Sequence, residues 1–156
     1  MQAARASVIV ICALALGACG GGGSSSRPVS LSSLPLVDGA SVLTQTRQCD
    51  GGVNSFCAIV AVIVDRGASS SGALATSEYN HLHALGWTGA AGDNGDERAA
   101  NSPGHKLRVT YSTAQGDLTG IDLGWIKRPW TITSSLSRAM YQRIPTMSIM
   151  LERGPA

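Results

Sequence analysis

The chain has few aromatic and few charged residues. Aromatic side chains make up 4% and charged side chains 14% of its 156 residues, and the formal net charge is +2. An average domain carries about 25% charged residues. A nucleic-acid-binding protein needs a clustered basic face that displaces phosphate counterions, so the composition argues against nucleic acid as a partner. With so few aromatics, Val, Ile, Leu and Met must supply most of the core of what the length predicts to be one domain.

The N-terminus contains one long apolar run, but it is too short to span a bilayer. Residues 6–16 read ASVIVICALAL, follow Arg5 and end at Leu16, the first residue of Leu16-Gly17-Ala18-Cys19. As a helix this run measures about 16 Å, against a hydrocarbon core of about 30 Å. A basic start, a short apolar run and a cleavage site of small residues are typical of a secretory signal. The sequence therefore predicts an export signal over residues 1–18.

The last four residues of this segment resemble the lipobox of bacterial lipoproteins. That pattern has Leu at −3, small residues at −2 and −1, and Cys at +1, and Leu16-Gly17-Ala18-Cys19 matches every position. The resemblance implies that a lipid is attached to the Cys19 thiol and that signal peptidase II cuts before it. Two acyl chains, at about 0.8 kcal/mol per buried CH₂, would hold the chain on a membrane stably. The alternative is an ordinary secretory signal with a coincidental cysteine.

The resemblance covers about the first 20 residues and implies a location. The mature chain is expected on the extracytoplasmic face of the bacterial cell membrane. In a cell with two membranes, Gly20 rather than Asp after the cysteine implies the outer one. Residues 19–41 begin GGGGSSS after the cysteine and stay rich in Ser and Pro, which predicts a flexible linker. Residues 42–156 are then expected to form a single small domain.

Two cysteines remain after the signal and the lipidated position are set aside. Cys12 lies within the signal, so Cys49 and Cys57 form an even pair in an exported chain, for which a disulfide is expected. Asp50-Gly51-Gly52 between them is a turn signal, and the bridge should therefore close a hairpin loop. The alternative, a metal pair, lacks two further soft ligands nearby.

Hydrophobic periodicity predicts an α+β fold. Helices are expected over 72–86 and 134–144, and strands over 42–47, 57–64, 106–112, 119–125 and 146–152. Residues 57–64, CAIVAVIV, read as a strand buried on both faces, and 88–104 as a polar loop. Without the first strand the order is β-α-β-β-α-β, a ferredoxin-like arrangement. We therefore expect an antiparallel sheet with two helices on one face, preceded by an extra N-terminal strand.

The histidines are the natural candidates for catalysis or metal binding. His81 and His83 are two positions apart on a predicted helix, so they do not share a face. A zinc site would need His105 and the acids Asp93, Asp96 or Glu97. The serines of 67–72 do not fit a Gly-x-Ser-x-Gly nucleophile motif and are typical of a helix-capping turn, with Ser71 as the N-cap. We assign no catalytic residue, metal ligand or cofactor from the sequence.

A second candidate site is the segment Trp125-Ile126-Lys127-Arg128-Pro129-Trp130. Its two aromatics, Trp125 and Trp130, flank two cations, Lys127 and Arg128. Such a cluster can hold a sugar, a phosphate polymer or a lipid headgroup. The alternative is a strand end in which Trp125 packs inward while Lys127 and Arg128 are solvated.

These observations favour a non-catalytic, membrane-anchored module that binds another envelope protein or a wall polymer. The alternative is a small envelope hydrolase or metal-binding protein that uses His81, His83 and His105.

Overall fold

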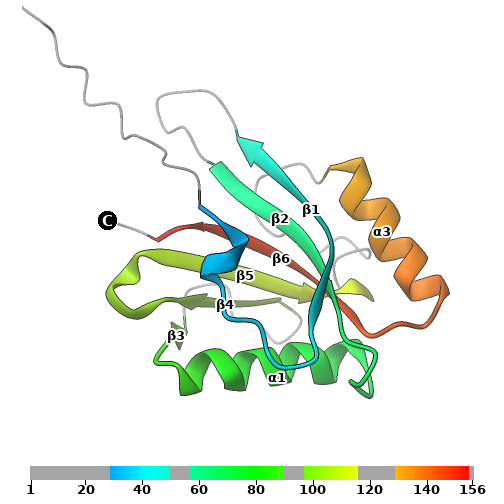
Figure 1. Ribbon diagram of the computed structural model, residues 1–156, viewed down its shortest axis with the longest axis horizontal. Coiled ribbons are helices and arrows are strands. Elements are labelled where there is room, and N and C mark those ends of the chain that lie inside the picture. Colours follow the sequence, from blue (N-terminus) through cyan, green and yellow to red (C-terminus); the bar gives the residue numbers. More distant parts are fainter. Residues whose placement is uncertain (1–28, 50–56, 90–96, 116–128, 155–156) are drawn as a thin grey trace, which may run out of the picture.

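The structure is a computed structural model that describes residues 29–49, 57–89, 97–115 and 129–154 (Figure 1). Two long helices and six strands fall in these ranges, which confirms the α+β class. The elements in chain order are η1 Leu31–Ser33, β1 Ser41–Cys49, β2 Cys57–Val64, α1 Ser71–Ala84, β3 Thr88–Gly89, β4 Glu97–Asn101, η2 Pro103–His105, β5 Leu107–Thr113, α3 Trp130–Tyr141 and β6 Thr146–Arg153. None of the described helices is long and apolar enough to cross a membrane.

The six strands form one antiparallel sheet in the order β1-β2-β6-β5-β4-β3. Strand β6, the last along the chain, lies between β2 and β5, where Ala61 pairs with Ile149 and Ile149 pairs with Tyr111. This order is not ferredoxin-like. In a split βαβ unit the two strands joined by a helix run parallel with another strand between them. Here β5 and β6, which α3 connects, are adjacent and antiparallel. The sheet therefore has a different topology, and β1 is its edge strand rather than an addition to a ferredoxin-like fold.

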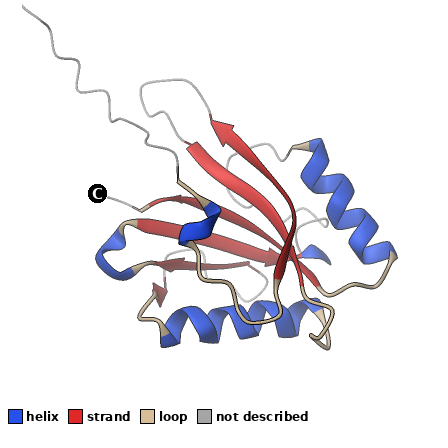
Figure 2. Ribbon diagram, in the orientation of Figure 1, coloured by secondary structure: helices blue, strands red, loops and turns tan. Residues whose placement is uncertain are grey.

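The two helices cover opposite faces of the sheet, not one face as expected (Figure 2). The odd-numbered side chains of β2, such as Ile59 and Ile63, pack with Leu74 and Leu82 of α1. The even-numbered ones, such as Val60, pack with residues of α3. A strand that is apolar on both faces must bury both, because side chains alternate across the sheet. The composition of 57–64 thus requires a cover on each side.

The N-terminal part of the described chain adds to the α1-side core. Val29, Leu31 and Leu34 are buried in the same cluster as α1, so the buried core includes part of the segment whose composition predicts a linker. Strands β3 and β4 lie where a polar loop was expected over 88–104, so that prediction was wrong for these residues. The expected strand over 119–125 lies outside the described residues.

Helix boundaries follow recognisable capping signals. Helix α1 begins after Ser70, whose Oγ accepts a hydrogen bond from the Ala73 N–H at 3.0 Å, so the N-cap is one residue earlier than expected. Gly86, with φ +80°, ends the helix as expected. Helix α3 begins directly after Pro129, four residues before its expected start. Proline is compatible with a helix start because the first backbone N–H groups need no partner within the helix.

Candidate binding surfaces

Of the segment from Trp125 to Trp130, the structure describes only Pro129 and Trp130. Trp125, Lys127 and Arg128 lie outside the described residues, as does Cys19. Trp130 is the first residue of α3 and is 79% exposed. The patch as a whole therefore stays a prediction, while Trp130 is placed at the protein surface.

The disulfide between Cys49 and Cys57 is present, as predicted. The two residues are directly paired in the β1–β2 register, at the last position of β1 and the first of β2. Their Cα atoms are 4.1 Å apart, close to the spacing of about 4.5 Å between residues in a non-hydrogen-bonded antiparallel pair. The bridge therefore fastens the ends of two neighbouring strands.

The histidines are not gathered into a described metal site. His81 and His83 lie in the last turn of α1, where the His83 ring is 4.6 Å from the Tyr79 ring, and His105 lies in η2. Among the described residues, no group of three or more His, Cys, Asp and Glu is placed to hold a metal ion. Asp93 and Asp96 lie outside the described residues.

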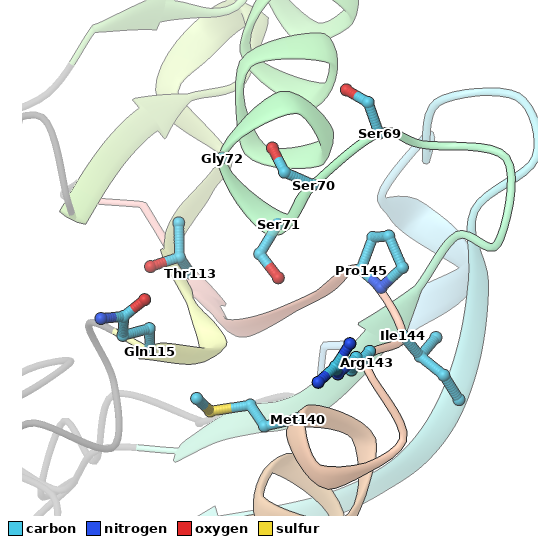
Figure 3. Close-up of a pocket in the computed structure, with 10 residues that line it drawn as sticks. All are labelled: Ser69, Ser70, Ser71, Gly72, Thr113, Gln115, Met140, Arg143, Ile144 and Pro145. Carbon is cyan, nitrogen blue, oxygen red and sulfur yellow. The ribbon is translucent and has the colours of Figure 1, made fainter.

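A pocket of about 440 Å³ lies where the start of α1, the end of β5 and the turn from α3 to β6 meet (Figure 3). Three stretches of chain that are far apart in sequence form its wall. The described lining residues are Ser69, Ser70, Ser71, Gly72, Thr113, Gln115, Met140, Arg143, Ile144 and Pro145.

Local structure fixes the side chain of Ser71 and the backbone of Arg143. The Oγ of Ser71 accepts a hydrogen bond from the Thr146 N–H at 2.9 Å, which ties the start of α1 to the start of β6. Arg143 follows α3 with a positive φ of 53°. The Arg143 N–H donates to the Met140 carbonyl and the Ile144 N–H to the Ala139 carbonyl, both at 2.9 Å. This is the Schellman arrangement, in which glycine usually occupies the left-handed position.

The arrangement suits binding by hydrogen bonds and charge. It offers serine and threonine hydroxyls, which donate and accept, and one guanidinium, which makes strong bonds to anionic oxygens. None of the described lining residues carries a carboxylate, an imidazole or a thiol. Sequence reasoning assigned its serines to a capping turn and missed Thr113, Met140 and Arg143. The one local signal was an arginine, rather than glycine, just after a helix.

A second, larger depression of about 680 Å³ lies beside the sheet edge. Residues 29–32 form one side, β1 forms the other, and Ile59 of β2 contributes to the lining. Arg47 of β1 is the only charged residue among its described lining residues. The depression therefore combines apolar and polar surface close to the point where the described chain begins.

Buried charge in the described domain lies away from both hollows. Glu78 of α1 is buried, and burial raises its pKa, although a hydrogen bond from Val37 and the nearby His81 oppose that shift. Burial also raises the pKa of Glu152, whose carboxylate lies 3.6 Å from Nε of Arg108. These carboxylates belong to the packing of the domain and do not line either hollow.

The chain was compared with models of protein families, with curated proteins and with solved structures, and none of the three gave a significant match.

Proposed function

We propose that this chain is a lipid-anchored module of the bacterial cell envelope whose folded domain binds a partner on the extracytoplasmic side. The observation that carries the proposal is Leu16-Gly17-Ala18-Cys19 at the end of an 11-residue apolar run. A signal of this length cannot serve as a permanent membrane span, so stable attachment would come from acyl chains on Cys19.

The disulfide supports export. Structural disulfides form and persist outside the cytosol, where thiols are not kept reduced. Cys49 and Cys57 form such a bridge between paired strands. The cytosolic alternative, a pair of reduced thiols, would leave these two strand ends without their covalent link.

The pocket beside Ser71 and Arg143 supports binding rather than chemical conversion. Its described side chains can hold a polar or anionic group, since they supply hydroxyls and a cation. An envelope protein or a wall polymer carries such groups.

Mass spectrometry of the chain purified from membranes tests the anchor. We expect a mature N-terminus at Cys19 that carries two or three acyl chains, as two-chain anchoring requires. The variant Cys19→Ser should lose the acyl mass, whereas Cys12→Ser, which removes a thiol inside the signal, should keep it. An unmodified Cys19 in the native chain, or Cys19→Ser chains distributed between membrane and soluble fractions as the native ones are, would contradict the proposal.

Co-sedimentation with purified wall polymer tests the binding role of the pocket. If the pocket holds anionic groups of the wall, the native chain should sediment with the insoluble polymer. Arg143→Gln should sediment less, and added salt should weaken the native interaction, because both reduce charge-assisted contacts. Equal sedimentation of the native chain and Arg143→Gln would remove the pocket from the binding role.

A further inference from the structure

Helix α3 carries an exposed aromatic residue at each end. Trp130 is 79% exposed and Tyr141 is 91% exposed. They are eleven positions apart, which at 3.6 residues per turn places them within about 20° of each other around the helix axis and about 16 Å apart along it. The opposite side of α3 is buried, with Ile132 and Leu136 packed against the sheet. Both rings therefore project from the outer side of the helix.

The side chains between the two rings are short, and their hydroxyls form hydrogen bonds within the helix. Ser134 and Ser137 occupy the same side of α3 by helical spacing. The Ser134 hydroxyl donates to the Thr131 carbonyl at 3.2 Å, and the Ser137 hydroxyl donates to the Thr133 carbonyl at 3.0 Å. Because these side chains are short and satisfied within the helix, Trp130 and Tyr141 stand above them as two separate contact points.

The helix and the stretch of chain that follows it carry charge of one sign. Residues 129–151 contain Arg138 and Arg143 and no Asp or Glu. Both arginines are exposed. A basic residue close to an anionic lipid surface strengthens attachment by about fivefold, an effect that salt weakens.

We propose that α3 lies flat on the headgroup region of the bilayer that carries the lipid anchor, with Trp130 and Tyr141 inserted at the interface. This inference rests on the proposed lipidation of Cys19. Tryptophan and tyrosine are the residues enriched at membrane–water interfaces, because each combines an apolar ring with a polar group. Arg138 then faces lipid phosphates.

The length of chain before the domain makes this contact effective. Nine residues, 20–28, separate Cys19 from Val29. Fully extended, the ten steps between them span about 35 Å, comparable with the diameter of a domain whose radius of gyration is about 14 Å. A short tether gives an effective concentration in the millimolar range. Two rings and one arginine that would bind weakly on their own can therefore orient a domain that is already anchored.

The pattern fits a bilayer better than a protein groove. A helix that docks into a protein groove presents apolar anchors at i, i+3 or i+4, and i+7. The outer side of α3 has serines at the corresponding positions, Ser134 and Ser137, and aromatics only at its ends. Two rings at the ends of the helix can both contact a planar surface. A groove, in contrast, would place the central serines against apolar walls.

Fluorescence of the lipidated chain tests the proposal. The chain is purified from membranes and reconstituted into vesicles of phosphatidylethanolamine and phosphatidylglycerol that include brominated acyl chains, which quench nearby tryptophans. The variant Trp125→Phe leaves two of the three tryptophans, and of these Trp87 is buried in the core. We expect bromine to quench Trp130, and the quenching to disappear in the Trp125→Phe/Trp130→Phe variant.

Three further variants, each in the Trp125→Phe background, sharpen the test. Tyr141→Ser should reduce quenching of Trp130, and Arg138→Gln should lower the docked-to-undocked ratio by about fivefold. Leu85→Ser removes a side chain that is also exposed, at the end of α1 on the other face of the sheet, and should leave quenching unchanged.

The outcomes separate this inference from the proposed function. If Cys19 carries acyl chains and the protein stays in the vesicles but Trp130 remains unquenched, the docking is wrong while the anchor stands. The same holds if Trp130 becomes shielded only when a second protein is added, which would make α3 a protein-binding surface. If Cys19 is unmodified and the chain leaves the vesicles, both proposals fail together.

Discussion

The carboxylate of Glu78 accepts a hydrogen bond from the backbone N–H of Val37 at 2.9 Å, across 41 positions of sequence. Glu78 lies on α1 and is 1% exposed, and its second oxygen, Oε1, is buried with no hydrogen-bond partner among the described residues. This bond ties the segment before β1 to α1, in addition to the apolar contacts that the segment makes in the core. It also places an ionisable group where charge is costly, because water cannot reach it.

Replacing Glu78 by glutamine should change how stability depends on pH. Burial raises the pKa of Glu78, so between the unfolded and folded pKa values the folded state binds more protons. The free energy of unfolding therefore falls as the pH rises through this window, by about 1.4 kcal/mol for each unit of pKa difference. Glu78→Gln does not titrate but keeps an oxygen for Val37. Its stability relative to the native chain should rise between about pH 4 and pH 7, as measured by urea unfolding at both values. An unchanged difference would show that Glu78 does not titrate in this window.

Removing the disulfide should lower the free energy of unfolding by about 2–3 kcal/mol, because the cross-link restricts a short loop of the unfolded chain. Chemical unfolding of the native chain with and without reductant measures the difference. The double variant Cys49→Ala/Cys57→Ala should match the reduced native chain and should not respond to reductant. If reductant also destabilised that variant, the loss of stability in the native chain would not come from the disulfide.

Leu136→Ala should destabilise the domain by about 2–5 kcal/mol, because the side chain is fully buried between α3 and the sheet. Ser137→Ala, at the next position of the same helix, changes an exposed residue and should alter stability by no more than about 0.5 kcal/mol. Thermal or urea unfolding of the two variants gives the comparison. Similar losses in both would mean that α3 does not pack on the sheet as described.

Gly154→Ala should destabilise the domain by about 1–3 kcal/mol. A Cβ at this position would collide with the backbone carbonyl of His105, and backbone cannot move aside as a flexible side chain can. Gly89→Ala is the control, since a Cβ there meets nothing within 4 Å. If unfolding measurements show equal effects, the turn at η2 does not lie against the end of β6.

Arg143→Gly should stabilise the domain by about 1 kcal/mol, because glycine adopts the left-handed conformation without the steric cost that Arg143 bears. Arg138→Gly, inside α3, should have the opposite sign and cost up to about 1 kcal/mol. Urea unfolding of the two variants should show changes of opposite sign in the free energy of unfolding. Arg143→Gly should at the same time bind wall polymer less well, which would show that the strained arginine is kept for binding.

Much of the secondary structure was predictable because local patterns encode it. The apolar, β-branched run over 57–64 predicted a strand buried on both faces, and alternation over 106–112 and 146–152 predicted β5 and β6. Strand β4, with the sequence ERAAN, was missed because alanine and charged residues have low strand propensity. Its pairing with β5 makes it a strand, and pairing partners are not written in the local sequence.

The candidate site was less predictable than the fold class. The disulfide followed from counting cysteines in a chain that is predicted to be exported. Trp130 was singled out for its place in a short aromatic and basic segment, and the structure places it at the surface. The pocket needed Ser71, Thr113 and Arg143 to meet from three separate elements. No spacing in the sequence brings such residues together, because their distances depend on the order of the strands.

By itself, the sequence determined the α+β class and the disulfide, and it predicts the export signal and lipid anchor, because each depends on residue types at short spacing. Only the tertiary structure decided that β6 lies between β2 and β5, that the helices cover opposite faces, and that the outer side of α3 presents Trp130 and Tyr141 to solvent. The physical reason is that these features arise from packing between distant segments. Helical periodicity shows that two residues share a side of a helix, but the sheet it packs on determines which side stays exposed.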